Sequence, residues 1–259
     1  LIVDEGDPLN ELLFNKSIDR IKSLGIFKTV DSKISNGSNE SLKVVDITVQ
    51  EQPTGEISLA AGVGTSGSTI GGGITEKNFL GKGINLKTNL ELSEEKIKGK
   101  FIYSKPNFNY SENTLFTSLV SSNTDRLKDF GYETTNFGIS LGTRFEQYEN
   151  LFFSPELDLS VEDLKTNSTA SSNLKKQAGN YEDLYFNYGL DYDLRDSSYK
   201  ASSGNKTSFY QALPVVSDNN EIANTLIFTQ YTKLDAETDM VGKASIFLKA
   251  VNSIDDNDV

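Results

Sequence analysis

The most regular hydrophobic pattern of the chain lies in residues 184–195, with the sequence LYFNYGLDYDLR. Its apolar positions are Leu184, Phe186, Tyr188, Leu190, Tyr192 and Leu194, and polar or small residues fill the positions between them. Successive side chains of a strand point to opposite faces, so this alternation predicts a strand with one apolar and one polar face. The segment is longer than the ~5–6 residues usual in soluble strands and suits a tilted membrane strand of roughly 9–11 residues.

The same alternation returns from residue 55 to the end of the chain. It predicts strands at 55–64, 69–76, 84–92, 97–108, 115–123, 137–145, 151–162, 184–195, 206–215, 223–233 and 241–251. Pro155 removes one ladder donor from its strand, which predicts a local irregularity. A Gly/Ser turn is expected at 65–68. Short turns are expected at 78–83, 109–113 and 147–150, and longer polar loops at 125–133 and 165–180, the last of them mobile. Short turns on one side and long loops on the other are typical of outer-membrane barrels.

Residues 1–52 follow another pattern. Leu13, Ile18, Ile21 and Leu24 keep helical spacing after Asn10, and Gly25 follows as a C-terminal cap. Two strand-like segments, 26–30 and 42–49, flank a turn cluster at 36–39. We expect a small α/β unit that ends in a hairpin, separated from the strand-rich region by the break at 52–55.

The repeated strands fit a membrane barrel or a soluble β-sandwich, and alternation alone does not separate the two. The polar faces carry Lys87, Glu91, Arg144, Glu156, Asp158, Glu162, Asp191, Asp193 and Arg195, which would line a hydrated lumen or face bulk water. Aromatic residues expected near strand ends, as an interfacial girdle requires, are Phe79, Tyr103, Phe108, Phe152 and Tyr199. Strand length, these aromatics and the high cost of an open sheet edge in lipid favour the barrel.

Composition narrows the function further. The chain has no Cys, His or Trp, which excludes metal sites built on Cys or His and catalysis by Ser-His-Asp or Cys-His. A net charge of −12 makes nucleic acid an unsuitable partner. Glu156 and Asp158 share a strand face as carboxylate pairs of hydrolases do, but nothing in the sequence marks a substrate cleft, so we expect no enzyme and no cofactor. The chain begins inside a patterned segment and ends in an acidic stretch, which suggests part of a longer precursor.

Five segments, in order along the chain, resemble the BamA family of outer-membrane assembly factors. Residues 19–30 (DRIKSLGIFKTV) resemble the helix and strand of the family's last periplasmic POTRA repeat, and residues 45–55 (VDITVQEQPTG) resemble its final strand. Residues 75–83 (TEKNFLGKG) resemble the turn between barrel strands two and three. Residues 104–108 (SKPNF) resemble the end of strand four, and FNYG at 186–189 with DLRD at 193–196 resembles strand eight and its turn. Departures are a missing Pro before Gly204, most of the first POTRA strand and the C-terminal half of the barrel.

The resemblance implies a mainly β fold. It implies a partial antiparallel transmembrane β-barrel in residues 55–259, about ten or eleven strands of a larger one, preceded by a POTRA remnant in residues 1–52 that lies in the periplasm. The family inserts and folds outer-membrane proteins, so unfolded outer-membrane proteins, assembly lipoproteins and outer-membrane lipid are the expected partners. The alternatives are a TamA-like or two-partner-secretion pore and, from another class, a soluble or surface β-sandwich adhesin.

The first predicted barrel strand would be the site of this activity. Its seam with the last strand would be weakly paired, and its free backbone groups could template an incoming client strand. The residues expected to form this edge are Gly55, Ile57, Ser58, Leu59, Ala60, Ala61, Gly62, Val63 and Gly64. Gly62 and Gly64 would weaken and bend it, or else mark a barrel corner with no gating role.

Overall fold

The computed structural model describes residues 5–39, 42–64, 67–197, 201–218, 220–235 and 239–254. Its N-terminal unit consists of α1 (Glu11–Ser23) and the antiparallel hairpin β1 (Phe27–Asn36) and β2 (Lys43–Glu51). The side chain of Asn10 caps α1 by accepting hydrogen bonds from the backbone of Leu12 and Leu13, and Gly25, with φ +66°, follows its C-terminal cap. The predicted α/β unit and hairpin are confirmed, although β1 is longer than the sequence pattern indicated.

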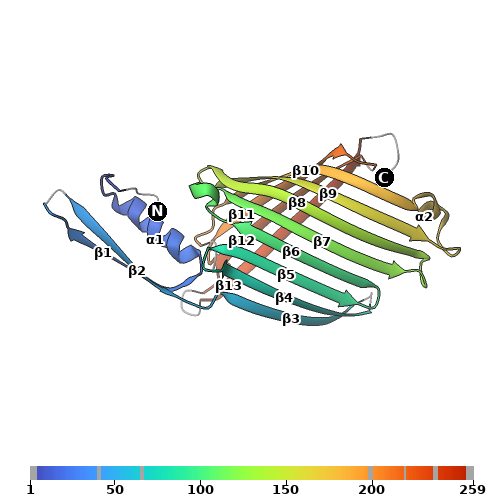
Figure 1. Cartoon of the computed structure of the whole chain (residues 1–259), viewed down its shortest axis with the longest axis horizontal. Coiled ribbons are helices and arrows are strands. Elements are labelled where there is room, and N and C mark those ends of the chain that lie inside the picture. Colours follow the sequence, from blue (N-terminus) through green and yellow to red (C-terminus); the bar gives the residue numbers. More distant parts are fainter. Residues whose placement is uncertain are drawn as a thin grey trace.

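The rest of the chain forms one antiparallel sheet of eleven strands in sequence order. Its strands are β3 (Gly55–Gly64), β4 (Gly67–Phe79), β5 (Ile84–Ser93), β6 (Lys96–Lys105), β7 (Thr114–Arg126), β8 (Tyr132–Tyr148), β9 (Leu151–Thr166), β10 (Gly179–Asp193), β11 (Gly204–Val216), β12 (Glu221–Lys233) and β13 (Val241–Ser253). The sheet curls, so that β11, β12 and β13 pass behind the strands at the front of Figure 1. The strands form one curved open sheet rather than two facing sheets, so the fold is that of a partial barrel and the sandwich alternative is wrong.

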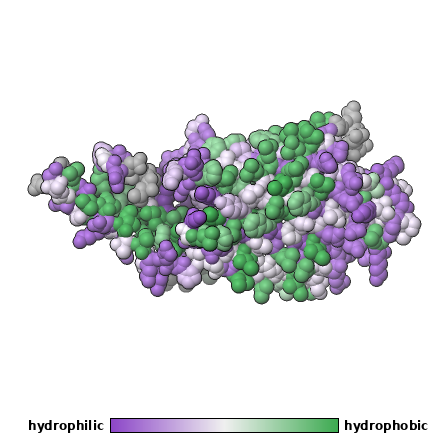
Figure 2. All heavy atoms as spheres, viewed as in Figure 1, coloured by the Kyte–Doolittle hydropathy of each residue, from purple (hydrophilic) through white to green (hydrophobic). Residues whose placement is uncertain are grey.

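The two faces of the sheet have the reverse of a soluble protein's polarity. On the outer face of β8 and β9, Ile139 is 43% and Leu159 48% exposed. On the inner face, Ser140 is 2% and Asp191 4% exposed. Figure 2 shows hydrophobic residues over the middle of the strands and hydrophilic residues at the end where α2 lies. An exposed apolar band with polar residues inside is the arrangement that a barrel in lipid requires.

The β-ladder is continuous along most strands and opens at Pro155. The register of β8 with β9 runs from Tyr132↔Thr166 to Gly142↔Glu156 and resumes at Phe145↔Phe153, without Pro155 in between. On the opposite side Pro155 aligns with Tyr188 of β10. The gap lies only on the side of β8, because proline lacks the N–H that would pair there, and β9 continues past Pro155.

Several expectations about the connections need correction. The predicted loop 125–133 shrinks to five residues, because Asp125 pairs with Glu133 and Arg126 with Tyr132 in the β7–β8 ladder. The predicted loop 165–180 holds the ends of β9 and β10 and the short helix α2 (Ser172–Lys176). The turn between β5 and β6 is tight although it lies on the predicted long-loop side, so the length asymmetry is weaker than expected. The predicted turn at 65–68 lies partly outside the described residues.

One predicted girdle residue faces the wrong way. Phe152 lies opposite Asp191 in the β9–β10 register, on the inner face, and the guanidinium of Arg144 stacks over its ring at 4.6 Å from the centroid. Phe152 and its neighbour Phe153 point to opposite faces of the strand, because successive side chains alternate. Position near a strand end therefore does not predict which face a residue occupies. Phe79 and Phe108 are exposed near strand ends as expected, and Tyr199 lies outside the described residues.

No helix in the described ranges is both long enough and apolar enough to span a membrane.

Candidate functional site

The candidate site is the edge of the sheet formed by β3. This strand pairs with β4 in unbroken register from Gly55↔Glu76 to Gly64↔Gly67, and it is the last strand of the sheet on that side. All nine residues named from the sequence lie in it: Gly55, Ile57, Ser58, Leu59, Ala60, Ala61, Gly62, Val63 and Gly64. The structure thus brings them together on one free edge, and their role in pairing with a client strand stays a prediction.

The outward side chains of this edge are more exposed than those elsewhere in the sheet. Ile57 is 76%, Leu59 85% and Val63 88% exposed, against 48% for Leu159 in the interior of the sheet. Two features contribute to the difference: only β4 flanks β3, and the β4 residues opposite Ser58, Leu59 and Ala60 are the glycines Gly73, Gly72 and Gly71. In the membrane these side chains are covered by lipid or by another strand, because both provide apolar surroundings.

The inner side of the edge is lined by small residues. Ser58, Ala60 and Gly62 of β3 lie beside Gly73, Gly71 and Thr69 of β4 in the register. A Cβ at Gly73 would lie 2.8 Å from Asn89 Oδ1 and 3.0 Å from Ser58 Oγ, so a larger residue there requires the Asn89 side chain to shift. A Cβ at Gly62 would meet nothing within 4 Å, so close packing does not require this glycine.

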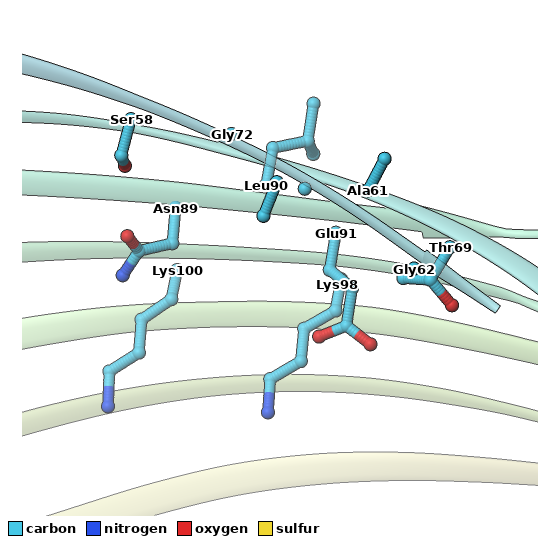
Figure 3. A pocket seen from close by; sticks show the side chains of 12 residues that line it. Ser58, Ala61, Gly62, Thr69, Gly72, Asn89, Leu90, Glu91, Lys98 and Lys100 are labelled. Atoms are coloured by element: carbon cyan, nitrogen blue, oxygen red, sulfur yellow. The ribbon is translucent and has the colours of Figure 1, made fainter. Parts of the chain in front are cut away.

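A groove of about 590 Å³ lies over these small residues (Figure 3). Its lining runs from Ser58 on β3 across the strands to Lys98 and Lys100 on β6. The sequence argument did not single out the two lysines. Alternation along the predicted strand 97–108 would have found them, because residues 98 and 100 lie on the face opposite to Phe101 and Tyr103.

A cluster of charged side chains lies on the inner face of the sheet, on strands distant from β3. Asp191 Oδ2 lies 3.3 Å from Arg144 Nη2, and its Oδ1 lies 3.1 Å from Lys206 Nζ. Ser208 Oγ and Tyr210 OH both donate to the same Oδ1. Arg144 and Asp191, both expected on polar faces, therefore meet on the inner face, and their cluster with Lys206 joins β8, β10 and β11. Asp193 and Arg195, also expected inside, form their own ion pair at 2.6 Å.

The N-terminal unit is held against one end of the sheet by charges that the sequence did not reveal. Arg20 of α1 lies 2.6 Å from Glu112 in the β6–β7 connection and 3.6 Å from Glu146 of β8, and Lys16 lies 3.5 Å from Glu149. The hydrogen bond and the positive charge of Arg20 lower the pKa of Glu112 below its usual value. The side chain of Gln52 donates to the carbonyl of Gly25 at 3.0 Å, which ties the end of the hairpin to the end of the helix.

The described part of the chain holds no group of three or more Asp or Glu side chains placed to bind a metal ion. Glu156 and Asp158 lie on the inner wall of β9, and Glu156 borders a wide, open hollow on the inner face rather than an enclosed cleft. The arrangement as a whole offers backbone pairing at an edge and polar contacts along an inner wall.

Residues 78–258 match the family model described as the Omp85 superfamily domain. Among solved structures, the chain is similar to BamA from Haemophilus ducreyi lacking POTRA domains 1-3, with 22% identity and a TM-score of 0.69 over 97% of this chain and 51% of that one. It is also similar to CdiB from Acinetobacter baumannii, with 11% identity and a TM-score of 0.56 over 98% and 49% of the two chains. It is similar as well to CdiB from Escherichia coli, with 13% identity and a TM-score of 0.62 over 96% of this chain and 50% of that one. The chain spans about half the length of each of these structures, and at such identities the likeness concerns the fold.

Proposed function

We propose that this chain, which belongs to the Omp85 superfamily of outer-membrane β-barrel proteins, is part of an assembly factor that inserts and folds other β-barrel proteins. The proposal is supported by the Omp85 match and by the position of β3 as the first strand of the sheet, the strand expected to meet the last strand of a whole barrel at the seam. An unfolded outer-membrane protein would be the client, and the lipid around the outer face is the medium into which it is released.

The physical basis is the cost of unpaired backbone groups. A strand edge in the hydrocarbon region leaves N–H and C=O groups without water, at several kcal/mol for each unsatisfied group. A client strand that pairs with β3 satisfies its own backbone and that of the edge at once. Its outward side chains also cover Ile57, Leu59 and Val63, which only β4 flanks in this chain. The edge thus favours an amphipathic strand over an unpatterned one.

We also propose that residues 1–52 are the end of a POTRA repeat in the periplasm and that assembly lipoproteins are its partners. The contacts of Lys16 and Arg20 with Glu112, Glu146 and Glu149 support a fixed position beside the β6–β7 and β8–β9 turns. In that position the hairpin would lie where a client chain arrives before it reaches β3. No enzymatic step is needed for this activity.

Cysteine crosslinking in the full-length parent protein tests the edge. The chain has no cysteine, so Ser58→Cys and Ala60→Cys each introduce a single reactive thiol into it, and any cysteine in the rest of the parent protein is replaced by Ser. We expect both to form disulfides with a client that carries one cysteine in its last strand. Ser122→Cys is the matched control, since Ser122 faces inward on β7, which has partners on both sides. Equal capture at Ser122, or no capture at Ser58 and Ala60, would contradict templating at β3.

The second candidate function is a translocation pore of the TamA-like or two-partner-secretion kind. It is favoured by the structures named CdiB, whose fold likeness extends over nearly the whole chain. The two functions differ in their product. An assembly factor yields a folded client resistant to protease in the membrane, whereas a pore yields a passenger on the far side of reconstituted vesicles.

A further inference from the structure

The groove behind the β3 edge has a chemical character that strand pairing alone does not require. Its β6 wall carries Lys98 and Lys100, both half-buried and both on the inner face. In Figure 3 the two side chains extend in the same direction, past Asn89 and Glu91 of β5. A chain with net charge −12 has here a local excess of positive charge beside its candidate site.

Neither lysine is neutralised by contact. Glu91 stands directly opposite Lys98 in the β5–β6 register, yet no ion pair within 4 Å is found for Lys98 or Lys100 in the described ranges of the chain. Asp191, by contrast, contacts two cations. The groove lysines thus retain the capacity to bind an anion.

Positive and negative side chains of the inner face lie on different strands. Lys96, Lys98 and Lys100 follow one another on the inner face of β6, and the inner face of β9 carries Glu156, Asp158 and Glu162. The positive wall is the one nearer to the free edge, since β6 is three strands from β3 whereas β9 is six strands away. A negatively charged segment inside the curve of the sheet is therefore drawn toward the β3 side.

The spacing of the lysines indicates which anion fits. Two residues apart on one strand face, their Cα atoms are about 7 Å from each other. Carboxylates at positions i and i+2 of an extended chain have the same spacing. This chain's own β9 carries such a pair, Glu156 and Asp158, on its inner face. The polar face of a barrel strand is thus a natural source of the matching pattern.

The groove also has room for a chain. Its volume of about 590 Å³ lies within the ~300–1,000 Å³ typical of ligand sites. Its floor along β3 and β4 carries side chains no larger than those of Ser58 and Thr69. A segment lying on this floor is close to the free edge without yet being paired with it.

We propose that Lys98 and Lys100 form an acceptor site on the inner wall for an extended client segment that carries carboxylates at alternate positions. The inference rests on the proposed function and specifies the client that the β3 edge receives. The segment is held over the small residues of β3 and β4 by two charge pairs and then passes to the edge. A client strand with an uncharged polar face pairs with β3 without this step.

Peptide binding to the chain in detergent micelles tests the site. The probes are two fluorescent amphipathic peptides, identical except that the polar face carries Glu or Gln at positions i and i+2. By fluorescence anisotropy we expect the Glu peptide to bind about tenfold more tightly, the effect of two partly exposed charge pairs. Raising the salt concentration should reduce this preference.

The variant Lys98→Gln/Lys100→Gln should lose the preference for Glu while its affinity for the Gln peptide is unchanged. The matched control is Lys128→Gln/Lys176→Gln, which removes the same charge at two exposed lysines of the β7–β8 loop and of α2, and it should keep the preference. Lys98→Glu/Lys100→Glu should instead favour a peptide with Lys at the two positions. Circular dichroism checks that each variant is folded.

The outcomes separate the two proposals. Equal binding of the Glu and Gln peptides to the unmodified chain, or an equal loss of preference in the control variant, overturns the acceptor site and leaves pairing at β3 intact. Failure of both peptides to bind overturns the acceptor site and the proposed function together.

Discussion

Leu159→Arg probes the claim that the outer face of the sheet meets lipid. Leu159 pairs with Ile139 in the β8–β9 register, and both lie close to the middle of their strands. They are 48% and 43% exposed, and Leu157 and Val161 on the same face are 51% and 43% exposed. A residue at mid-strand on this face lies near the membrane midplane.

The magnitude depends on what surrounds the side chain. Arg on the lipid face near the midplane of a barrel costs about 2–4 kcal/mol, which is roughly a 30- to 700-fold change in the folding equilibrium. If the face met water, a half-exposed surface substitution would change stability by about 0.5 kcal/mol or less. The two environments therefore predict effects that differ several-fold.

The measurement is urea unfolding in phospholipid vesicles, followed by far-ultraviolet circular dichroism because the chain has no Trp. Ser160→Arg is the control, since Ser160 is next in sequence but faces inward, opposite Asp183 in the register. We expect Ser160→Arg to cost less than about 1 kcal/mol. Equal costs for the two variants, or a larger cost for Ser160→Arg, would refute the assignment of the faces.

Three further predictions concern a contact on the inner face, a contact at the N-terminal junction and the first residue of β11. Asp191→Asn should cost about 1–3 kcal/mol in urea unfolding, because it leaves Arg144 and Lys206 facing each other without the carboxylate, whereas Asp163→Asn at the exposed pair with Lys165 should cost about 0–0.5 kcal/mol. Because the pKa of Glu112 is lowered, its contact with Arg20 should stabilise the docked α1 above the usual glutamate pKa of about 4.3 and be lost as the pH falls through the lowered pKa. Spin labels on α1 and on the β6–β7 connection should therefore separate at acidic pH, and Arg20→Gln should give the same separation at pH 7. An unchanged distance between the labels would contradict this role of the Arg20–Glu112 contact. Gly204→Ala should cost over about 2 kcal/mol, because φ is +91° and the new Cβ would lie 2.2 Å from the carbonyl oxygen of Leu194, whereas Gly99→Ala, with nothing within 4 Å, should be near neutral.

Much of the fold followed from a single periodicity. The alternation at Leu157, Leu159 and Val161 identified both a strand and its outward face, and the structure leaves those residues exposed as a lipid-facing surface would be. Strand number and order followed in the same way, since antiparallel neighbours in sequence pair in space. Alternation is a local property, so local reasoning recovers it.

What depended on register could not be read from the sequence. Arg144, Asp191 and Lys206 come from three strands, and their meeting requires the register of β8, β9, β10 and β11 together. Phe152 was misplaced because its distance from a strand end was given more weight than its parity. The docking of Arg20 on Glu112 joins residues 92 positions apart and carries no sequence signal.

The reversed polarity of the sheet also determines where this protein can mature. A surface with Ile139 and Leu159 turned outward would adhere to other such surfaces in an aqueous compartment, and its polar interior would offer no core to hold the shape. Water would therefore destabilise the finished sheet, and a bilayer is the medium in which these strands can keep their curved arrangement.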